Sequence, residues 1–149
     1  MEKVHKPKKV FVEGSISPDF VSKSIASHQS KTDIGAHAIF LGQIRADQKD
    51  EGIVTGIEYS AYEEMAEKAF HDIREAAFAK FELSCMHIYH SLGIVPTGEI
   101  SLFVFVSSPH RRAAFEASEY IVEEIKANVP IFGKELVGQR GDYVWKENK

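Results

Sequence analysis

The chain has 149 residues, of which 44% are hydrophobic and 27% are charged, so it can form one globular domain. A domain of this size buries roughly two-thirds of its unfolded surface. The formal net charge of −4 excludes a general attraction to nucleic acid, and no stretch approaches the roughly 20 apolar residues of a membrane span.

The N-terminal residues 1–9 hold five basic or histidine side chains with no apolar run behind them. This pattern argues against a signal peptide and predicts a flexible basic tail. Residues 10–149 are expected to form a single domain, since no linker or repeat interrupts them. The lone cysteine, Cys85, lies in an apolar stretch and cannot form an intrachain disulfide. We interpret it as a structural thiol and expect a cytoplasmic protein.

A short strand and a helix are predicted at the start of this domain. Residues 10–13 can form the strand. Ser17 is a favoured N-cap, and Pro18 and Asp19 suit the first helical turn. The helix is expected to end near His28.

Two strands should follow. Residues 35–44 are apolar and rich in Ile, Phe and Ala, and they end at Arg45 before a polar run. Residues 53–61 return with apolar side chains at alternate positions, which is typical of a strand. The polar loop 46–52 makes the two segments candidate antiparallel partners.

From Tyr62 the apolar residues recur every three or four positions, which predicts an amphipathic helix. Its inner stripe is expected to contain Met65, Ala69, Phe70, Ile73, Ala76 and Ala77. Two further strands, residues 85–92 and 99–107, are separated by a turn that contains Pro96 between glycines and could join them as a hairpin.

A second long helix should begin near Ser108 and Pro109 and stop before Pro130. Its inner stripe is expected to contain Ala114, Phe115, Ser118, Ile121, Val122 and Ile125. After it, residues 129–133 should be non-helical and return the chain sharply. The order of elements predicts an α+β fold, a single domain with a largely antiparallel sheet and flanking helices.

The start of the second helix carries the clearest chemical signal. A helix N-terminus favours acids, yet His110, Arg111 and Arg112 stand there. Free helix N–H groups together with arginine suit a phosphate or a carboxylate. The alternative is that the arginines extend into solvent or pair with acids such as Glu116.

Other candidate cations are scattered along the chain. Lys126 borders the apolar face at the end of the second helix, and the return of the chain could bring Lys134 and Glu135 near it. Arg45 stands at a strand end, where functional residues often lie. Each also has a structural explanation, since a lysine complements a helix C-terminus and an arginine can cap a strand. The residues alone therefore predict an anion site built from scattered cations.

No metal site is expected. His37, His87 and His90 lie in predicted strands without the spacing of metal ligands. The sequence also contains no glycine-rich phosphate loop, GxSxG elbow or HExxH pair, so it does not support dinucleotide binding, serine hydrolysis or zinc proteolysis.

Four segments of the chain form a recognisable set: residues 40–45, residues 58–66, His110 and Arg111 followed by Phe115, and residues 126–135. Together they resemble the MoaE-like large (catalytic) subunit of molybdopterin synthase. That family shows, in order, an FxGxVR strand end, an LEYEAYxxMA helix start, an HR pair and a KxxxPIWKKE segment. The resemblance covers about residues 34–145, and four motifs in register make it specific.

The resemblance implies an α/β hammerhead core and a homodimer of large subunits within a heterotetramer, with a small ubiquitin-like sulfur carrier bound at each end. The carrier's C-terminal glycine thiocarboxylate would enter a pocket of the large subunit. Two sulfur additions would there convert cyclic pyranopterin monophosphate into the dithiolene of molybdopterin. This implies a sulfurtransferase of molybdenum cofactor biosynthesis that needs no cofactor.

By position, the resemblance assigns catalytic places to Lys126 and Lys134. Lys126 could donate a proton or stabilise charge as sulfur adds and the phosphate ester opens. His110 and Arg111 would act across the dimer interface. The full set of implied substrate-binding residues is Gln43, Ile44, Arg45, His110, Arg111, Lys126, Gly133, Lys134 and Glu135.

The chain departs from the family pattern at two places. Gly133 stands where the family has a lysine, and Lys134 is expected to compensate because glycine loosens the backbone beside it. Ser91 replaces the arginine of a common HRxG segment. Two alternatives therefore stay open: a noncatalytic paralogue that binds the carrier protein or a phosphorylated ligand, and an unrelated α+β ligand-binding protein.

Overall fold

The computed structural model describes residues 9–138 and 142–146, so all of the predicted basic tail except Lys9 lies outside the described residues. None of the described helices is long and apolar enough to cross a membrane. In chain order the elements are β1 (Phe11–Glu13), α1 (Pro18–His28), β2 (Ala36–Gln43), β3 (Gln48–Lys49), β4 (Gly52–Ala61), α2 (Glu63–Lys80), β5 (Cys85–Pro96), β6 (Ile100–Ser108), α3 (Arg111–Asn128), β7 (Ile131–Val137) and β8 (Asp142–Trp145).

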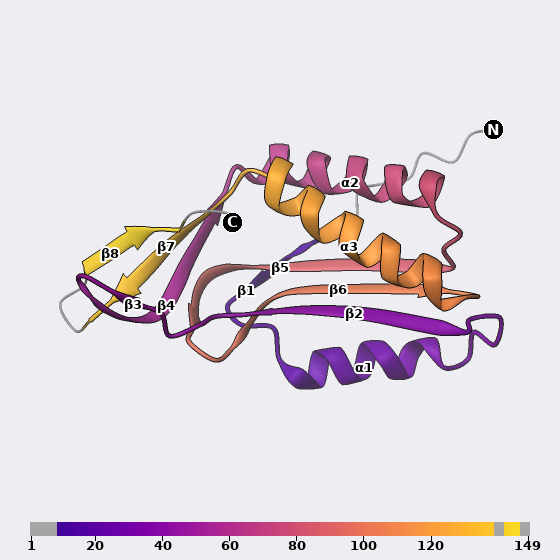
Figure 1. The fold of residues 1–149 in the computed structure, drawn as a ribbon, viewed down its shortest axis with the longest axis horizontal. Helices are drawn as coiled ribbons and strands as arrows, with labels where there is room; N and C mark the ends of the chain where they lie inside the picture. Colours follow the sequence, from indigo (N-terminus) through magenta and orange to yellow (C-terminus); the bar gives the residue numbers. More distant parts are fainter. Residues whose placement is uncertain (1–8, 139–141, 147–149) are drawn as a thin grey trace.

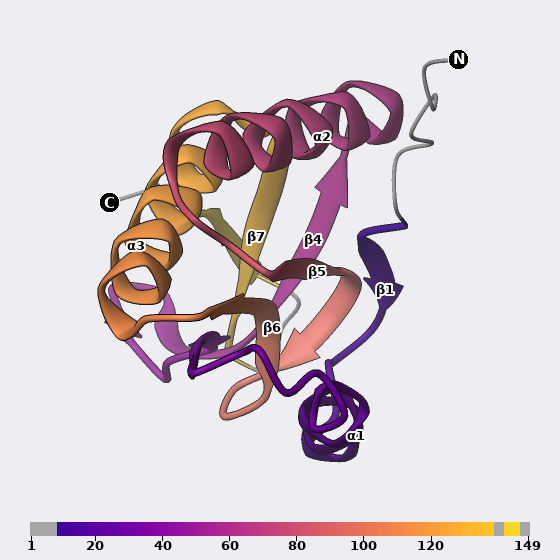
Figure 2. The ribbon, with the colours of Figure 1, turned by 90° about the vertical axis from the view of Figure 1, so that its right-hand side faces the viewer.

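The strands form one twisted sheet with helices on both faces. Its main order is β2-β6-β5-β4-β7-β8, with β1 beside β5 and β3 beside β4. Helices α2 and α3 cover one face, and α1 lies against the other (Figures 1 and 2). Every described strand pair is antiparallel except β1 with β5. This confirms the predicted α+β fold with a largely antiparallel sheet.

The main core lies between the sheet and the helices α2 and α3. Its helical side chains recur at helical spacing, as the sequence predicts, and side chains of β5 and β6 meet them. Full burial of one such large apolar side chain stabilises the fold by about 1.5–3 kcal/mol. The residues are Ala66, Phe70, Ile73, Ala77, Ala117, Ile121 and Ile125 on the helices and Met86, Ile88, Val104 and Val106 on the strands.

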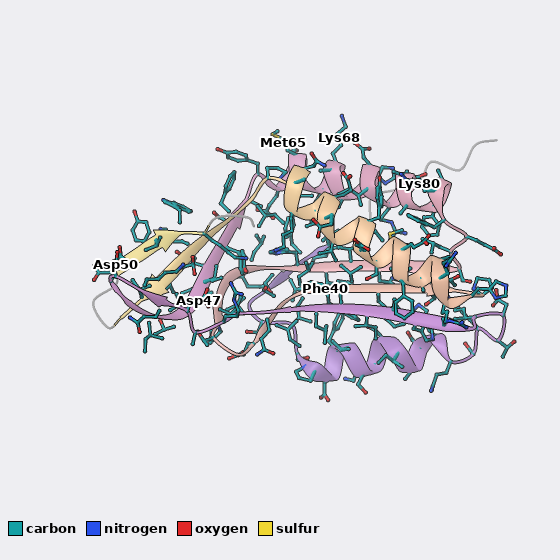
Figure 3. All side chains as sticks on the ribbon, viewed as in Figure 1. Phe40, Asp47, Asp50, Met65, Lys68 and Lys80 are labelled. Carbon is teal, nitrogen blue, oxygen red and sulfur yellow. The ribbon has the colours of Figure 1, made fainter. Side chains whose placement is uncertain are left out.

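Two residues assigned to the inner stripes lie outside them. Met65 is 64% exposed at the outer side of α2 (Figure 3), and Phe115 is 68% exposed on α3. Each immediately precedes or follows a buried alanine, Ala66 or Ala114, so it is turned about 100° away from the stripe. The exposure of Phe115 leaves a large apolar side chain on the surface.

Helix α1 forms as predicted and packs on the opposite face of the sheet. The Ser17 side chain accepts a hydrogen bond from the Phe20 N–H, which caps the helix. Phe103 and Phe105 of β6 are fully buried in a second core cluster beneath α1. They alternate with Val104 and Val106, which face α2 and α3, because successive strand residues point to opposite faces.

The strand pairing corrects one expectation. The loop 46–52 does not join β2 to β4 as partners: β2 pairs with β6, while β4 pairs with β5 and β7. The loop instead contains β3, which forms a small hairpin with the start of β4. Long-range pairing with β6 and β7 thus prevails over sequence proximity.

Strands β7 and β8 were not predicted. The expected return after Pro130 does occur, but the chain continues as β7 along β4 and then turns back as β8. Gly133, Lys134 and Glu135 interrupt the apolar pattern of β7, which hides it from a reading of hydrophobicity. This pairing places the end of α3, β4, β7 and β8 around one site.

Candidate functional site

Lys126 lies in the last turn of α3 beside a small cavity, called here the Lys126 pocket. The cavity has a volume of about 20 Å³, which is room for roughly one water molecule. It is continuous with a wider outer groove of about 430 Å³, since the two share five lining residues. The pocket is lined by Tyr59, His90, Ile125, Lys126, Val129, Ile131, Gly133 and Lys146.

The turn after α3 forms one wall of this site. The Val129 N–H donates to the Ile125 carbonyl and ends the helix, and Pro130 prevents its continuation. The chain then enters β7, where Gly133 pairs with Tyr59 of β4. The Tyr59 ring meets the His90 ring edge-on, with centroids 4.9 Å apart. Three segments distant in sequence therefore build the floor below Lys126.

Lys146, just after β8, also lines the pocket. Its backbone N–H donates to the Gly133 carbonyl at 2.7 Å. A Cβ placed on Gly133 would lie 3.4 Å from the Lys146 Cβ. Sequence reasoning missed Lys146, because it reaches the site only through the pairing of β8 with β7.

The pocket shifts the pKa of its basic groups. Burial, and then the charge of Lys146, lowers the pKa of Lys126 to about 8. Burial also lowers the pKa of Lys146, while Glu135 acts in the opposite direction. The pKa of His90 falls to about 4, mainly through burial and against the effect of its hydrogen bond to the Ser91 carbonyl, so its ring is neutral at pH 7. The site therefore holds two crowded lysines beside a neutral histidine.

Several of the predicted residues surround this site. Glu135 is buried on the same side of β7 as Gly133, and Lys49 lies 3.6 Å from its carboxylate. Ile44 is buried in a cluster with Ile57 and Tyr59. Arg45 is exposed and pairs with Asp47 at 3.2 Å. The charges of Arg45 and Asp47 both act on Lys146.

Gln43 and Lys134 do not line the pocket. Gln43 is exposed at the end of β2. The Lys134 amine lies 3.8 Å from a Glu58 carboxylate oxygen and over the rings of Tyr143 and Trp145, at 4.4 and 5.4 Å from their centroids. Lys134 alternates with Gly133 along β7, so its side chain leaves the opposite face of the strand. The structure does not bring Lys134 to the position that Gly133 leaves vacant.

His110 and Arg111 form a second basic region at the other end of α3. They line an open hollow of about 670 Å³ together with Gly35, Pro109, Arg112, Phe115 and Glu116. The first turn of the helix contains no acid. Arg112 reaches Glu116 at 4.0 Å, whereas Arg111 has no ion pair among the described residues. Positions 110 and 126 are separated by about 24 Å of helix, so one chain does not bring the two basic regions together.

Three potential metal ligands converge on the other face of the sheet. His28, Cys85 and His87 have ligand atoms that all lie within 4.8 Å of one another. The sequence did not indicate this group, because His28 comes from α1 and the other two residues come from β5.

The chain is similar to known proteins over most of its length. The family model of the MoaE protein matches residues 15–128. Molybdopterin synthase catalytic subunit 2 of Aedes aegypti is 39% identical over 127 residues, which cover 84% of this chain and 79% of that protein. The molybdopterin synthase catalytic subunit of Aspergillus fumigatus is 37% identical over 122 residues, or 82% and 64% of the two chains.

Solved structures share the fold of this chain. Molybdopterin synthase from Staphylococcus aureus matches with a TM-score of 0.78 at 29% identity and covers 95% of this chain and 98% of its own. A complex of subunits 1 and 2 of molybdopterin-converting factor from Helicobacter pylori also gives 0.78, at 21% identity and with coverage of 94% and 90%, which supports the fold alone. The family model matches most of the length of this chain, and the catalytic subunit from Aedes aegypti is 39% identical to it. The chain therefore belongs to the MoaE family.

Proposed function

We propose that the chain is a catalytic subunit of molybdopterin synthase in molybdenum cofactor biosynthesis. It transfers sulfur from the C-terminal thiocarboxylate of a small subunit to cyclic pyranopterin monophosphate. The observation that carries this proposal is Lys126, a half-buried lysine with a pKa of about 8 where a groove narrows into a pocket. The names of the relatives, molybdopterin synthase catalytic subunits, support an enzyme of molybdenum cofactor biosynthesis, and the transfer of sulfur is part of the proposal.

The groove suits the end of a carrier protein. Its outer part is lined by Pro130, Phe132 and Trp145, which offer apolar surface to an extended peptide. Its inner part leads to Lys126 and Lys146, which offer charge to a terminal thiocarboxylate. A peptide that enters by the apolar part would therefore deliver its anionic end to the two amines.

Lys126 has the properties of a proton donor for this reaction. As sulfur adds to the pterin and the cyclic phosphate ester opens, negative charge develops on oxygen. An ammonium group close by stabilises that charge and can transfer its proton. With a pKa of about 8, Lys126 is mostly protonated at pH 7 yet releases its proton more readily than an ordinary lysine.

A second copy of the chain completes the anion site in this proposal. His110 and Arg111 lie about 22–24 Å of helix from Lys126 within one chain, which exceeds the reach of a small phosphorylated ligand. The edge strand β2 exposes Ile39, Phe40 and Leu41, and Phe40 is labelled in Figure 3. Such a surface fits a homodimer that, with two small subunits, forms a heterotetramer.

The second candidate function is a noncatalytic paralogue that holds the carrier protein or a phosphorylated ligand. Gly133 favours it, since a lysine expected from the family resemblance is absent there. Incubation with the thiocarboxylated carrier and cyclic pyranopterin monophosphate separates the two, because the enzyme forms molybdopterin whereas the paralogue only binds. A cytoplasmic location stays a prediction.

A further inference from the structure

We infer that Lys146 supplies the second amine of the active site, in the space that Gly133 leaves open. The inference rests on the proposed function for its chemistry, but the placement of Lys146 is independent of that function.

The backbone of Lys146 is held against Gly133. The hydrogen bond of 2.7 Å from the Lys146 N–H to the Gly133 carbonyl continues the pairing of β7 with β8. A Cβ on Gly133 would meet Ile57 Cγ2 at 3.1 Å and Tyr59 Cε1 at 3.4 Å, as well as the Cβ of Lys146. A side chain at position 133 and the side chain of Lys146 would thus compete for the same space.

The side chain of Lys146 faces the charged groups of the pocket. Its charge lowers the pKa of both Lys126 on α3 and His90 on β5. Its own pKa responds to Glu135 on β7 and to Arg45 and Asp47 after β2. Lys146 also lines both the pocket and the outer groove together with Lys126. From this shared lining and the mutual charge effects we place the Lys146 amine beside Lys126.

The two amines of this pocket have different roles in the inferred site. Lys146 holds the anionic thiocarboxylate or phosphate, while its charge keeps the pKa of Lys126 low enough for proton transfer near neutral pH. Lys134 does not take this role, since it lies on the opposite face of β7 with Glu58 and two aromatic rings.

The test compares Lys146→Met, which keeps the apolar stem without the charge, with Lys146→Arg, which keeps the charge. The pKa of Lys126 is measured by NMR of its side-chain carbon and nitrogen, and conversion is measured in parallel. Lys146→Met should raise the pKa of Lys126 and slow conversion at least tenfold, on the order of the contribution of one general acid–base or electrostatic group. Lys146→Arg should keep the pKa of Lys126 low and should retain most of the conversion rate. Lys134→Met is the matched control and should leave the pKa of Lys126 in place.

An unchanged Lys126 pKa in a folded Lys146→Met protein would overturn the inference, as would unchanged conversion. In a Lys146→Ala background, which removes the competing side chain beyond its Cβ, Gly133→Lys should recover conversion because it supplies a second amine to the same space. The pKa readout does not depend on turnover. An inactive parent protein that still shows the pKa shift would therefore contradict the proposed function while supporting the position of Lys146.

We also propose that the cluster of His28, Cys85 and His87 binds a divalent metal ion of the zinc type. Two imidazoles and one thiol are ligands that zinc prefers, and three protein ligands leave a fourth position for water. Cys85 and His87 are two residues apart on one face of β5, and His28 ends α1 above them. The cluster is distinct from the Lys126 pocket, which His90 lines from the other face of β5.

The hydrogen bonds of His28 orient its ring and fix which ring nitrogen faces the cluster. Its Nδ1 lies 2.6 Å from the Ser24 carbonyl oxygen, which can only accept, so Nδ1 carries the proton and Nε2 carries a lone pair. That Nε2 faces the Nε2 of His87 at 2.9 Å. Metal-bound histidines commonly donate their second ring nitrogen to a carbonyl in this way. A metal ion would replace the proton shared between the two rings and would displace the Lys31 amine, which lies 3.0 Å from the Cys85 sulfur.

Co²⁺ and Zn²⁺ are the probes for this site. Co²⁺ should bind with a stoichiometry of one per chain and give a thiolate-to-cobalt absorption band, and Zn²⁺ should raise Tm by joining α1 to the sheet. Cys85→Ser should abolish the band and His28→Gln should weaken binding at least tenfold, whereas His71→Gln on the surface of α2 should retain both. Binding without the band, or binding that survives both cluster variants, would identify an adventitious ion only and would overturn the proposal.

Discussion

The backbone N–H of Lys146 donates to the carbonyl of Gly133, so the last described strand brings a lysine to the one position of β7 that has no side chain. Lys126 lies across the same pocket. The family resemblance predicts two lysines in this site, at positions 126 and 133, and this chain has a lysine only at the first of them.

Replacement of Lys126 by alanine should abolish conversion while the protein stays folded. Lys126 borders the core without being part of its buried cluster, so its loss removes little packing. The expected decrease in kcat is roughly 100-fold or more, on the scale of general acid catalysis. Single-turnover kinetics measure the decrease, and circular dichroism checks the fold. Turnover like that of the parent would remove Lys126 from the mechanism.

The rate should fall as pH rises through about 8. The pKa of Lys126 is lowered to about 8, and only its protonated form can donate a proton, so the active form is lost above that value. A profile of kcat/KM against pH reports the free enzyme. In Lys146→Met the descending limb should move to higher pH, because removal of a neighbouring positive charge raises the pKa of Lys126.

The same pKa predicts an effect on stability. In the unfolded chain the pKa of a lysine is higher, so protonated Lys126 destabilises the folded state fully below about pH 8 and the penalty disappears as pH rises toward the unfolded value. Lys126→Met should therefore raise Tm at pH 7 and have little effect near pH 11. Thermal unfolding at the two pH values measures this, and a lower Tm for the variant at pH 7 would contradict the assigned burial.

Arg111→Ala should weaken the binding of cyclic pyranopterin monophosphate by about ten- to a hundredfold, as expected for loss of a charge-assisted hydrogen bond. Arg112→Ala is the matched control. Its effect should be smaller, because Arg112 already faces Glu116 on the same helix. Calorimetry compares the two affinities, and equal losses would assign the effect to overall charge.

If the partner's Arg111 acts with Lys126, two inactive variants should complement each other. A dimer of one Lys126→Ala chain and one Arg111→Ala chain contains one site with both defects and one intact site. After subunit exchange at equal amounts, about one quarter of the sites should be active by the symmetry of a two-chain dimer. Conversion at a substrate concentration below saturation measures this, and no recovery would mean that each site is built within one chain.

Much of the fold was accessible from the sequence. Helices α2 and α3 carry clear apolar periodicity, Ser17 marks the start of α1, and Pro130 marks the stop after α3. The strands β7 and β8 were hidden, because Gly133 and its charged neighbours break the apolar pattern and pairing with β4 supplies the stability instead.

The site was only partly accessible, for a related reason. Lys126 was predicted through its place on α3 and the family resemblance, and the structure sets it in a pocket. Lys146 reaches that pocket through β8, and His28 reaches Cys85 through the packing of α1. Neither contact has a local signature, since residues distant in sequence meet only when the sheet is complete. The expectation that Lys134 replaces the missing lysine neglected the alternation of side chains along a strand.

The most direct test of the account is a single-turnover reaction of the purified chain with the thiocarboxylated small subunit and cyclic pyranopterin monophosphate, with the dithiolene product detected. The account predicts that product forms with the parent chain and with Lys146→Arg, and that it is lost with Lys126→Ala and reduced with Lys146→Met. A parent chain that binds the small subunit tightly but forms no product would contradict it and would identify the chain as a binding paralogue.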